Sequence, residues 1–214
     1  MRLALFDLDN TLISRGTALS NAITGLCIDC GYGTDVEEWL KTQLAERANV
    51  DDFVRLVARF RLSDDVAQLW RRYVDRMTAS ITCRPEVLNG LDGMRTAGWT
   101  IGIVTNGAGD IQRAKLAATG LDRLINGLAV SGDVEIRKPD RRLFELAASR
   151  CGANLADGGW MVGDSPTGDI GGGHQAGLRT IWLRGRPWPE DLPAADHVVN
   201  GVTDAIAILQ TETE

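Results

Sequence analysis

Six short, predominantly apolar runs recur along the chain, each bounded by polar residues or glycine. They lie at residues 3–6, 100–104, 128–130, 160–162, 180–183 and 197–199. Apolar runs of this length are typical of strands buried in a parallel sheet. Two segments between them, 110–119 and 141–151, carry apolar side chains at helical spacing, and a glycine, a common helix stop, follows each. The alternation predicts an α/β fold, a doubly wound parallel sheet with a Rossmann-like core.

Residues 14–83 break this alternation, because no strand pattern occurs there. Four amphipathic segments fill the region instead, at 18–30, 35–47, 51–60 and 63–79. Asp51 and Ser63 are expected to be N-caps of the last two. So long a connection between neighbouring strands is unusual within one compact domain. We therefore expect an α/β core formed by 1–13 and 84–214, with a small α-helical cap domain, 14–83, over the crevice. Ordinary packing helices of a single domain are the alternative.

Composition and charge exclude some classes of partner. The chain has 214 residues, 44% hydrophobic and 24% charged, and a net charge of −6 without any block of five like charges, which argues against nucleic-acid binding. The absence of a long apolar run argues against a membrane span, and the few apolar residues before Asp7 are too short for a signal peptide. A cytoplasmic protein, monomer or homodimer, is expected, with residues 211–214 frayed.

Two carboxylates, Asp7 and Asp9, follow the first apolar run directly. Ligands of open α/β sheets bind beyond the carboxyl ends of the strands, so both residues are expected at the active-site crevice. A close pair of charges there needs a partner, most simply a divalent cation. A turn or a helix cap is the alternative, because Asp and Asn favour both.

Polar residues also follow the second and third runs. Thr105 and Asn106 end the second run, where a hydroxyl and free backbone N–H groups suit a phosphate. Pro139 fixes the chain after Lys138, and a lysine held near carboxylates can neutralise phosphate charge. Taken singly, Thr-Asn-Gly is also a common turn, and most exposed lysines are simply solvated.

Two further carboxylates follow the fourth run. Asp164 ends that run as Asp7 ends the first, and Asp169 stands five residues later at the start of the next helix. If the two strands are neighbours, Asp7, Asp9 and Asp164 can meet around one hard cation. Asp169 is then an outer ligand or a group that orients Lys138.

These motifs occur in a fixed order: Asp7-Leu-Asp9-Asn-Thr11, then Thr105-Asn106, then Lys138, then Asp164 with Asp169. In this order they resemble the haloacid dehalogenase-like hydrolases. The resemblance covers essentially the whole chain, and the helical insertion looks like the subfamily with a small helical cap. The stretch 171–177 departs from the family's usual sequence without touching the catalytic positions.

The resemblance implies that Asp7 is the nucleophile, which attacks phosphorus and forms an aspartyl-phosphate. Asp9 would be the general acid and then the general base. The resemblance also implies Mg²⁺ as the cofactor, bound by the side chains of Asp7 and Asp164 and by the backbone carbonyl of Asp9.

The phosphate-binding residues follow from the same resemblance. Thr105 and Lys138 would hold the transferring oxygens and thereby act in catalysis, with Asn106 beside them. Asp169 would be an outer ligand of the metal or would orient Lys138.

Asp9 also distinguishes the branches of the family, since members of the dehalogenase branch lack a second Asp. Its presence favours phosphoryl transfer and predicts a magnesium-dependent phosphatase of a small phosphorylated metabolite. A sugar phosphomutase and a catalytically silent, phosphate-binding regulatory member are the alternatives. The arginines of the cap region are left without a role, the Cys27/Cys30 pair is interpreted as incidental, and His174 as structural.

Overall fold

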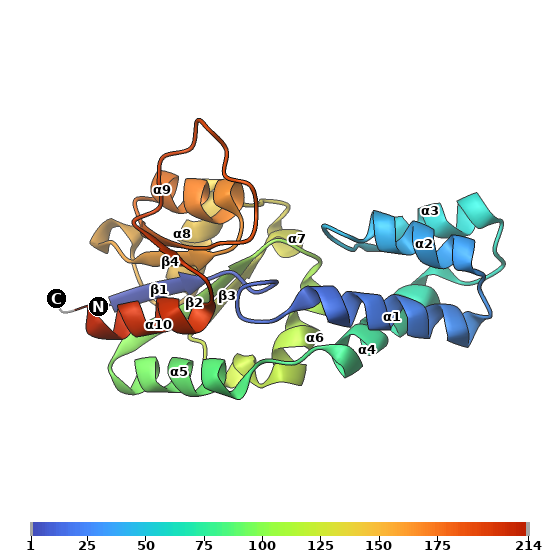
Figure 1. The fold of residues 1–214 in the computed structure, drawn as a ribbon, viewed down its shortest axis with the longest axis horizontal. Helices are drawn as coiled ribbons and strands as arrows, with labels where there is room; N and C mark the ends of the chain where they lie inside the picture. The colour runs from blue at the N-terminus through green and yellow to red at the C-terminus, as the bar shows by residue number, and fades with distance from the viewer. Residues whose placement is uncertain (1, 213–214) are drawn as a thin grey trace.

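The computed structural model describes residues 2–212 and contains one six-stranded sheet (Figure 1). The strands are β1 (Arg2–Phe6), β2 (Trp99–Thr105), β3 (Gly127–Val130), β4 (Trp160–Gly163), β5 (Arg179–Leu183) and β6 (His197–Val199). All neighbouring pairs are parallel, in the order β3-β2-β1-β4-β5-β6, which is the order of a Rossmann fold. The predicted α/β fold is therefore confirmed, and every predicted strand is present.

The order of the strands reverses between β1 and β4, which lie side by side at the centre of the sheet. Phe6 at the end of β1 pairs with Ile103 of β2 and with Val162 of β4. The residues that follow these three strands consequently emerge at one edge of the sheet. Such a switch point is where open α/β sheets bind ligands.

Helices cover both faces of the sheet. In chain order the α-helices are α1 (Arg15–Cys30), α2 (Thr34–Gln43), α3 (Val50–Phe60), α4 (Val66–Ser80), α5 (Pro85–Thr96), α6 (Gly109–Thr119), α7 (Ser131–Val134), α8 (Arg141–Arg150), α9 (Gly172–Ala176) and α10 (Val202–Thr211). Short 3₁₀ turns occupy Leu121–Arg123 and Leu155–Asp157, and a π-helical turn, η3, occupies Pro166–Gly171. The amphipathic pattern of the core predicted α6 and α8, whereas it did not single out α5 or α10.

The side chains of β1 alternate between two hydrophobic cores. Leu3 and Leu5 pack toward α8, while Ala4 and Phe6 belong to the core that includes α5 and α10. Figure 1 shows α8 and α9 on one side of the sheet and α5 and α10 on the other. Both faces of β1 are therefore buried, which explains why its sequence is a continuous apolar run rather than an alternating one.

The first four helices form a separate group beside the sheet (Figure 1). Phe53 of α3 packs edge-on against Trp70 of α4, with 5.6 Å between ring centroids, and also contacts the ring of Tyr73. The Trp70 indole N–H donates to the carboxylate of Asp110 at the start of α6, which links this group to the sheet side of the molecule. The boundary at 14–83 stays a prediction, and this grouping of helices is consistent with it.

The ends of the inserted helices differ from the sequence expectation. Asn49, not Asp51, caps α3, in a capping box with Asp52, and Asp65, not Ser63, caps α4. In both cases the residue immediately before the first helical turn has the side-chain oxygen that can accept a backbone N–H. At the end of the chain, Thr211 is still helical, and Glu212 follows the helix and pairs with Arg179. The rest of the segment predicted to fray, 213–214, lies outside the described residues.

The most consequential difference concerns the segment predicted as a helix over 35–47. Helix α2 ends at Gln43, and residues 44–49 form a loop between α2 and α3, here named the cap loop.

No helix within residues 2–212 is long and apolar enough to cross a membrane.

Candidate active site

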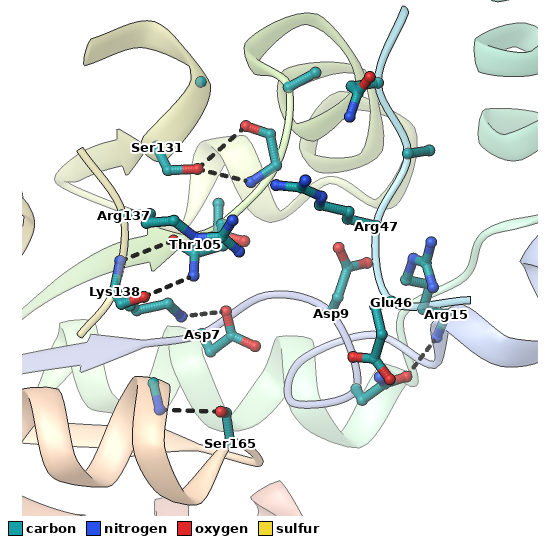
Figure 2. Close-up of a pocket in the computed structure, with 18 of the residues that line it drawn as sticks. Asp7, Asp9, Arg15, Glu46, Arg47, Thr105, Ser131, Arg137, Lys138 and Ser165 are labelled. Carbon is teal, nitrogen blue, oxygen red and sulfur yellow. Dashed lines mark hydrogen bonds and ion pairs between the residues drawn. The ribbon is translucent and has the colours of Figure 1, made fainter. Parts of the chain in front are cut away.

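A cavity of about 540 Å³ lies at the carboxyl ends of β1, β2 and β4 (Figure 2). Its floor contains every residue that the sequence analysis proposed for catalysis or binding, from Asp7 to Asp169. The cap loop faces this floor and supplies the opposite wall. The structure thus brings together side chains that are up to 162 positions apart in sequence, as Asp7 and Asp169 are.

Asp7 is the first residue after β1 and is buried. Its backbone N–H donates to the Val162 carbonyl oxygen over 2.9 Å, which continues the β1–β4 ladder by one step. Its carboxylate accepts a hydrogen bond from Lys138 Nζ at 2.6 Å through Oδ1. Burial raises the pKa of Asp7 to about 7, against the opposing effect of the Lys138 ammonium and with further upward effects of Asp169 and Asp9.

Lys138 is buried and holds three oxygens around its ammonium group. Besides Asp7 Oδ1, Nζ donates to the Val104 carbonyl oxygen at 2.7 Å and lies 2.6 Å from Asp169 Oδ1. Burial by itself lowers the pKa of Lys138, but the carboxylates of Asp169 and Asp7 outweigh it and raise that pKa above its ordinary value. The lysine is therefore a permanent positive charge beside Asp7.

The side chain of Asn106 fixes the backbone of Lys138. Lys138 N–H donates to Asn106 Oδ1 at 2.9 Å, and Asn106 Nδ2 donates to the Lys138 carbonyl oxygen at 3.2 Å. This pair of hydrogen bonds clamps the loop after β3 to the end of β2. The amide side chain thus has a structural partner in this state, and the proposed contact of Asn106 with phosphate stays a prediction.

Asp7, Asp164 and Asp169 form a cluster of carboxylates that can hold a metal ion. One oxygen from each lies within 4.8 Å of the other two. Burial raises the pKa values of Asp164 and Asp169, although Arg186 opposes this at Asp164 and Lys138 opposes it at Asp169. Three carboxylates that are difficult to ionise together fit a hard divalent cation with oxygen ligands.

The chain after β4 positions the last of these carboxylates. Asp169 lies in η3 and is fully buried, and its Oδ2 accepts the backbone N–H of Ser165 at 2.9 Å. Gly163 precedes this turn, and a Cβ at its position would overlap the Asp169 carboxylate. The glycine at the end of β4 is therefore required by the close approach of Asp169.

Asp9 points to a different set of partners from Asp7. Lys115 Nζ lies 2.8 Å from both of its carboxylate oxygens, and Gln112 Nε2 donates to its Oδ2 at 3.1 Å. Gln112 Nε2 also donates to Thr105 Oγ1 at 2.7 Å, and Lys115 donates to Gln112 Oε1 at 2.8 Å. The Asp9 side chain is consequently outside the three-carboxylate cluster, and the contact of its backbone carbonyl with the metal stays a prediction.

Sequence reasoning missed Lys115 and Gln112. Lys115 follows Ile111 by one turn on the buried face of α6, and a lysine on such a face is the signal that the sequence offers. It is only 2% exposed, and a buried ammonium group requires a carboxylate partner. Gln112 lies one turn earlier on the same helix face, where i and i+3 side chains are neighbours.

Arginines reach the cavity from several elements. Arg15 of α1 is buried and donates to the carbonyl oxygens of Leu44 and Ala45 in the cap loop, each at 2.5 Å. Arg186, after β5, pairs with Asp164 at 2.8 Å and with Glu46 of the cap loop at 3.3 Å. Arg15 and Arg186 thus tie the cap loop to the residues around it.

The remaining residues that the sequence singled out lie elsewhere. His174 Nε2 is 2.9 Å from Thr180 Oγ1 and 3.7 Å from Asp196, and it does not line the cavity, which supports a structural role. Cys27 and Cys30 are free thiols on α1.

Comparison with known proteins places this geometry in a family. The sequence pattern of the haloacid dehalogenase-like hydrolases matches residues 4–183. Phosphoserine phosphatase of Thermus thermophilus is 38% identical over 111 residues, which are 52% of this chain and only 44% of that protein. Glyceraldehyde 3-phosphate phosphatase of Methanopyrus kandleri is 29% identical over 211 residues, 92% of this chain and 89% of that protein.

A solved structure gives the same result for the whole fold. The HAD phosphatase of Thermococcus onnurineus superposes with a TM-score of 0.71 at 25% identity, over 99% of both chains. The family pattern covers both the strand ends that carry the carboxylates and the inserted helices between them. This chain therefore belongs to the haloacid dehalogenase-like hydrolase family.

Proposed function

We propose that this protein is a magnesium-dependent phosphatase that hydrolyses a small phosphorylated metabolite through an aspartyl-phosphate on Asp7. The observation that carries the proposal is the separation of two carboxylates. Asp7 is buried with Lys138 and the Asp164–Asp169 pair, whereas Asp9 is held apart by Lys115. One carboxylate can thus act as nucleophile while the other handles protons, as stepwise phosphoryl transfer requires.

In the first step, the Asp7 carboxylate attacks phosphorus, an oxygen–phosphorus bond forms, and the bond from phosphorus to the ester oxygen breaks. Asp9 donates its proton to the leaving oxygen. Oδ1 of Asp7 is engaged by Lys138, so Oδ2 is the attacking atom. The Thr105 hydroxyl donates to a phosphoryl oxygen, and the positive charge of Lys138 balances the phosphoryl charge; Lys138 binds a phosphoryl oxygen by exchanging one of its present partners for it.

In the second step, water attacks the phosphorus of the aspartyl-phosphate and gives a proton to Asp9, and Asp7 is regenerated as inorganic phosphate leaves. Asp7, Asp164 and the Asp9 backbone carbonyl would hold Mg²⁺, and Asp169, the third carboxylate of the cluster, would lie outside the set of direct ligands. When bound, Mg²⁺ supplies positive charge that keeps Asp7 ionised and neutralises the phosphoryl oxygens. Similarity to proteins named as phosphatases supports this assignment of the reaction.

The test measures release of inorganic phosphate from p-nitrophenyl phosphate with Mg²⁺ and with a chelator. Asp7→Asn is expected to abolish release without loss of the fold, and Asp9→Asn to accumulate the phosphoenzyme, because water then lacks its base. Asp122→Asn, an exposed aspartate outside the cavity, is the matched control. Activity of Asp7→Asn, or full activity in chelator, would disprove the proposal. In a parallel assay with a sugar phosphate as the substrate, isomerisation without phosphate release would indicate a mutase.

A further inference from the structure

Two arginines approach the cavity from opposite sides. Arg47 extends from the cap loop and Arg137 from the loop before Lys138, and Figure 2 shows their guanidinium groups directed toward one another across the site. Within residues 2–212 neither guanidinium has a carboxylate within ion-pair distance. Arg186, which also lines the cavity, differs from both because the carboxylates of Asp164 and Glu46 neutralise its charge.

The cap loop presents Arg47 from a fixed backbone. At one end, the buried Arg15 guanidinium donates to two successive carbonyl oxygens of the loop. At the other end, Asn49 and Asp52 form the reciprocal capping box, with Asn49 N–H donating to Asp52 Oδ2 at 2.8 Å. A loop anchored at both ends directs its exposed side chain more narrowly than a solvated helix face does.

Arg137 is equally constrained at its backbone. It directly precedes Lys138, whose N–H and carbonyl oxygen are both held by Asn106. Its guanidinium therefore starts next to the proposed phosphate-binding wall and points into the space above it (Figure 2). The two arginines come from the cap loop and from the sheet side, so a molecule bound between them contacts both parts of the protein.

The phosphoryl group that Asp7 attacks does not need Arg47 and Arg137 to balance its charge. Lys138, Thr105 and the cation site already surround the position of attack beside Asp7. The carboxylates that line the cavity near the cap loop are Glu46, which pairs with Arg186, and Asp51, and neither pairs with Arg47 or Arg137. Two unneutralised guanidinium groups in one cavity repel each other unless an anion lies between them.

We propose that Arg47 and Arg137 together bind a second anionic group of the substrate, a carboxylate or a second phosphate, in addition to the phosphoryl group that Asp7 attacks. This inference rests on the proposed function and narrows its substrate class to phosphomonoesters with a second anion. The planar fork of arginine matches the oxygens of both groups. A cavity of about 540 Å³ suits a small molecule that carries both charges.

The test compares esters with the same number of carbon atoms, one of each pair with a second anionic group and the other with a hydroxyl in its place. Phosphoglycolate is paired with hydroxyethyl phosphate, and propanediol bisphosphate with hydroxypropyl phosphate, so that the two pairs distinguish a carboxylate from a second phosphate. The preference is the ratio of kcat/KM within a pair. We expect a preference of about tenfold or more for the anionic member of one pair, as charge-assisted hydrogen bonds provide.

Arg47→Gln and Arg137→Gln should each lower this preference by about tenfold, mainly through KM. Arg71→Gln, an exposed arginine on α4 outside the cavity, is the control and should retain the preference. A wild-type ratio near one in both pairs, or an unchanged ratio in both variants, would overturn the inference.

A binding experiment separates this inference from the proposed function. Calorimetric titration of Asp7→Asn with the same four esters measures the anion preference without turnover. If the wild type hydrolyses no ester, the proposed phosphatase activity fails, yet tighter binding of the anionic esters that depends on Arg47 still supports the anion site. Equal dissociation constants within both pairs would reject the anion site even in an active phosphatase.

Discussion

Lys115 Nζ lies 2.8 Å from both carboxylate oxygens of Asp9, and its side chain is nearly fully buried. Burial lowers the pKa of Lys115, and the neighbouring Asp9 carboxylate opposes that shift. Gln112 joins this pair to the Thr105 hydroxyl. A single network of buried and half-buried side chains therefore connects the proposed acid/base with the hydroxyl proposed to hold phosphate.

The first prediction concerns Lys115→Met, which keeps the length of the side chain and removes its charge. Asp9 loses the group that orients it, so steps that need proton transfer should slow by about tenfold or more. The loss should be larger for an alkyl phosphate than for p-nitrophenyl phosphate, because p-nitrophenolate leaves without a proton. The ratio of kcat/KM for the two esters measures this.

Lys41→Met is the control for Lys115→Met, because Lys41 is an exposed lysine on α2 paired with Glu37. It should leave the leaving-group ratio unchanged. Equal losses on both esters in Lys115→Met would show that Lys115 supports the fold or phosphate binding rather than Asp9. Circular dichroism of the variant separates a folding defect from a catalytic one.

The second prediction is a pH dependence of Mg²⁺ binding that originates at Asp7. Its pKa in the folded protein is raised to about 7 from 3.8, so the metal-free protein holds this proton over a range where the unfolded chain has lost it. The stabilisation that this bound proton gives the folded protein is fully present below 3.8, the pKa of Asp7 in the unfolded chain. It is lost as pH rises toward the folded pKa of about 7. Because Mg²⁺ needs the ionised carboxylate, its affinity should rise up to tenfold per pH unit below about 7 and level off above.

Isothermal titration of Mg²⁺ across this range tests the second prediction without any substrate. Asp7→Asn should bind Mg²⁺ more weakly and lose most of the slope. Any slope that remains belongs to Asp164 and Asp169, whose pKa values are also raised by burial. A flat affinity profile in the wild type would contradict the assignment of Asp7 as a buried metal ligand.

The third prediction follows from the contact of Arg186 with Asp164. The guanidinium occupies Asp164 Oδ2 at 2.8 Å, and its positive charge repels a cation in the carboxylate cluster. Arg186→Gln should therefore bind Mg²⁺ more tightly, by about threefold to tenfold, in line with a partly exposed charge. Glu46→Gln is the control, since Glu46 contacts the same arginine without contacting Asp164. Weaker Mg²⁺ binding in Arg186→Gln would show that Arg186 holds Asp164 in place for the metal.

The sheet and the strand-end residues were predictable because their signals are local. A buried parallel strand is a continuous apolar run, and polar residues at its carboxyl end, such as Asp7 and Asp164, meet at the switch point whatever the loops do. Their mutual approach around Lys138 follows from the order of the strands. This is why the cavity floor contains all of the residues proposed from sequence.

The wall opposite Asp7 was not predictable by the same means. Amphipathic spacing continued α2 through residue 47, but the helix ends at Gln43. Arg15, 29 positions away from Leu44, takes up the Leu44 and Ala45 carbonyl oxygens, which in a continued helix would accept backbone N–H groups. That contact is tertiary and leaves no periodic signal. Similarly, the partner of Asp9 is a lysine 106 positions away on α6, which only the packed structure brings near.

The fourth prediction concerns the backbone beneath the carboxylate cluster. Gly163→Ala places a methyl group where the Asp169 carboxylate lies, so Asp169 and its ion pair with Lys138 must shift. We expect a loss of about 1–3 kcal/mol in the free energy of unfolding, together with weaker Mg²⁺ binding. Gly16→Ala is the matched control: a Cβ at Gly16 meets nothing within 4 Å, and the residue lies in the first turn of α1. It should be neutral or stabilising by up to about 1 kcal/mol, because alanine favours the helix. Urea denaturation and Mg²⁺ titration of both variants measure the two effects, and a Gly163→Ala protein with wild-type stability and Mg²⁺ affinity would show that Asp169 can move without consequence for the site.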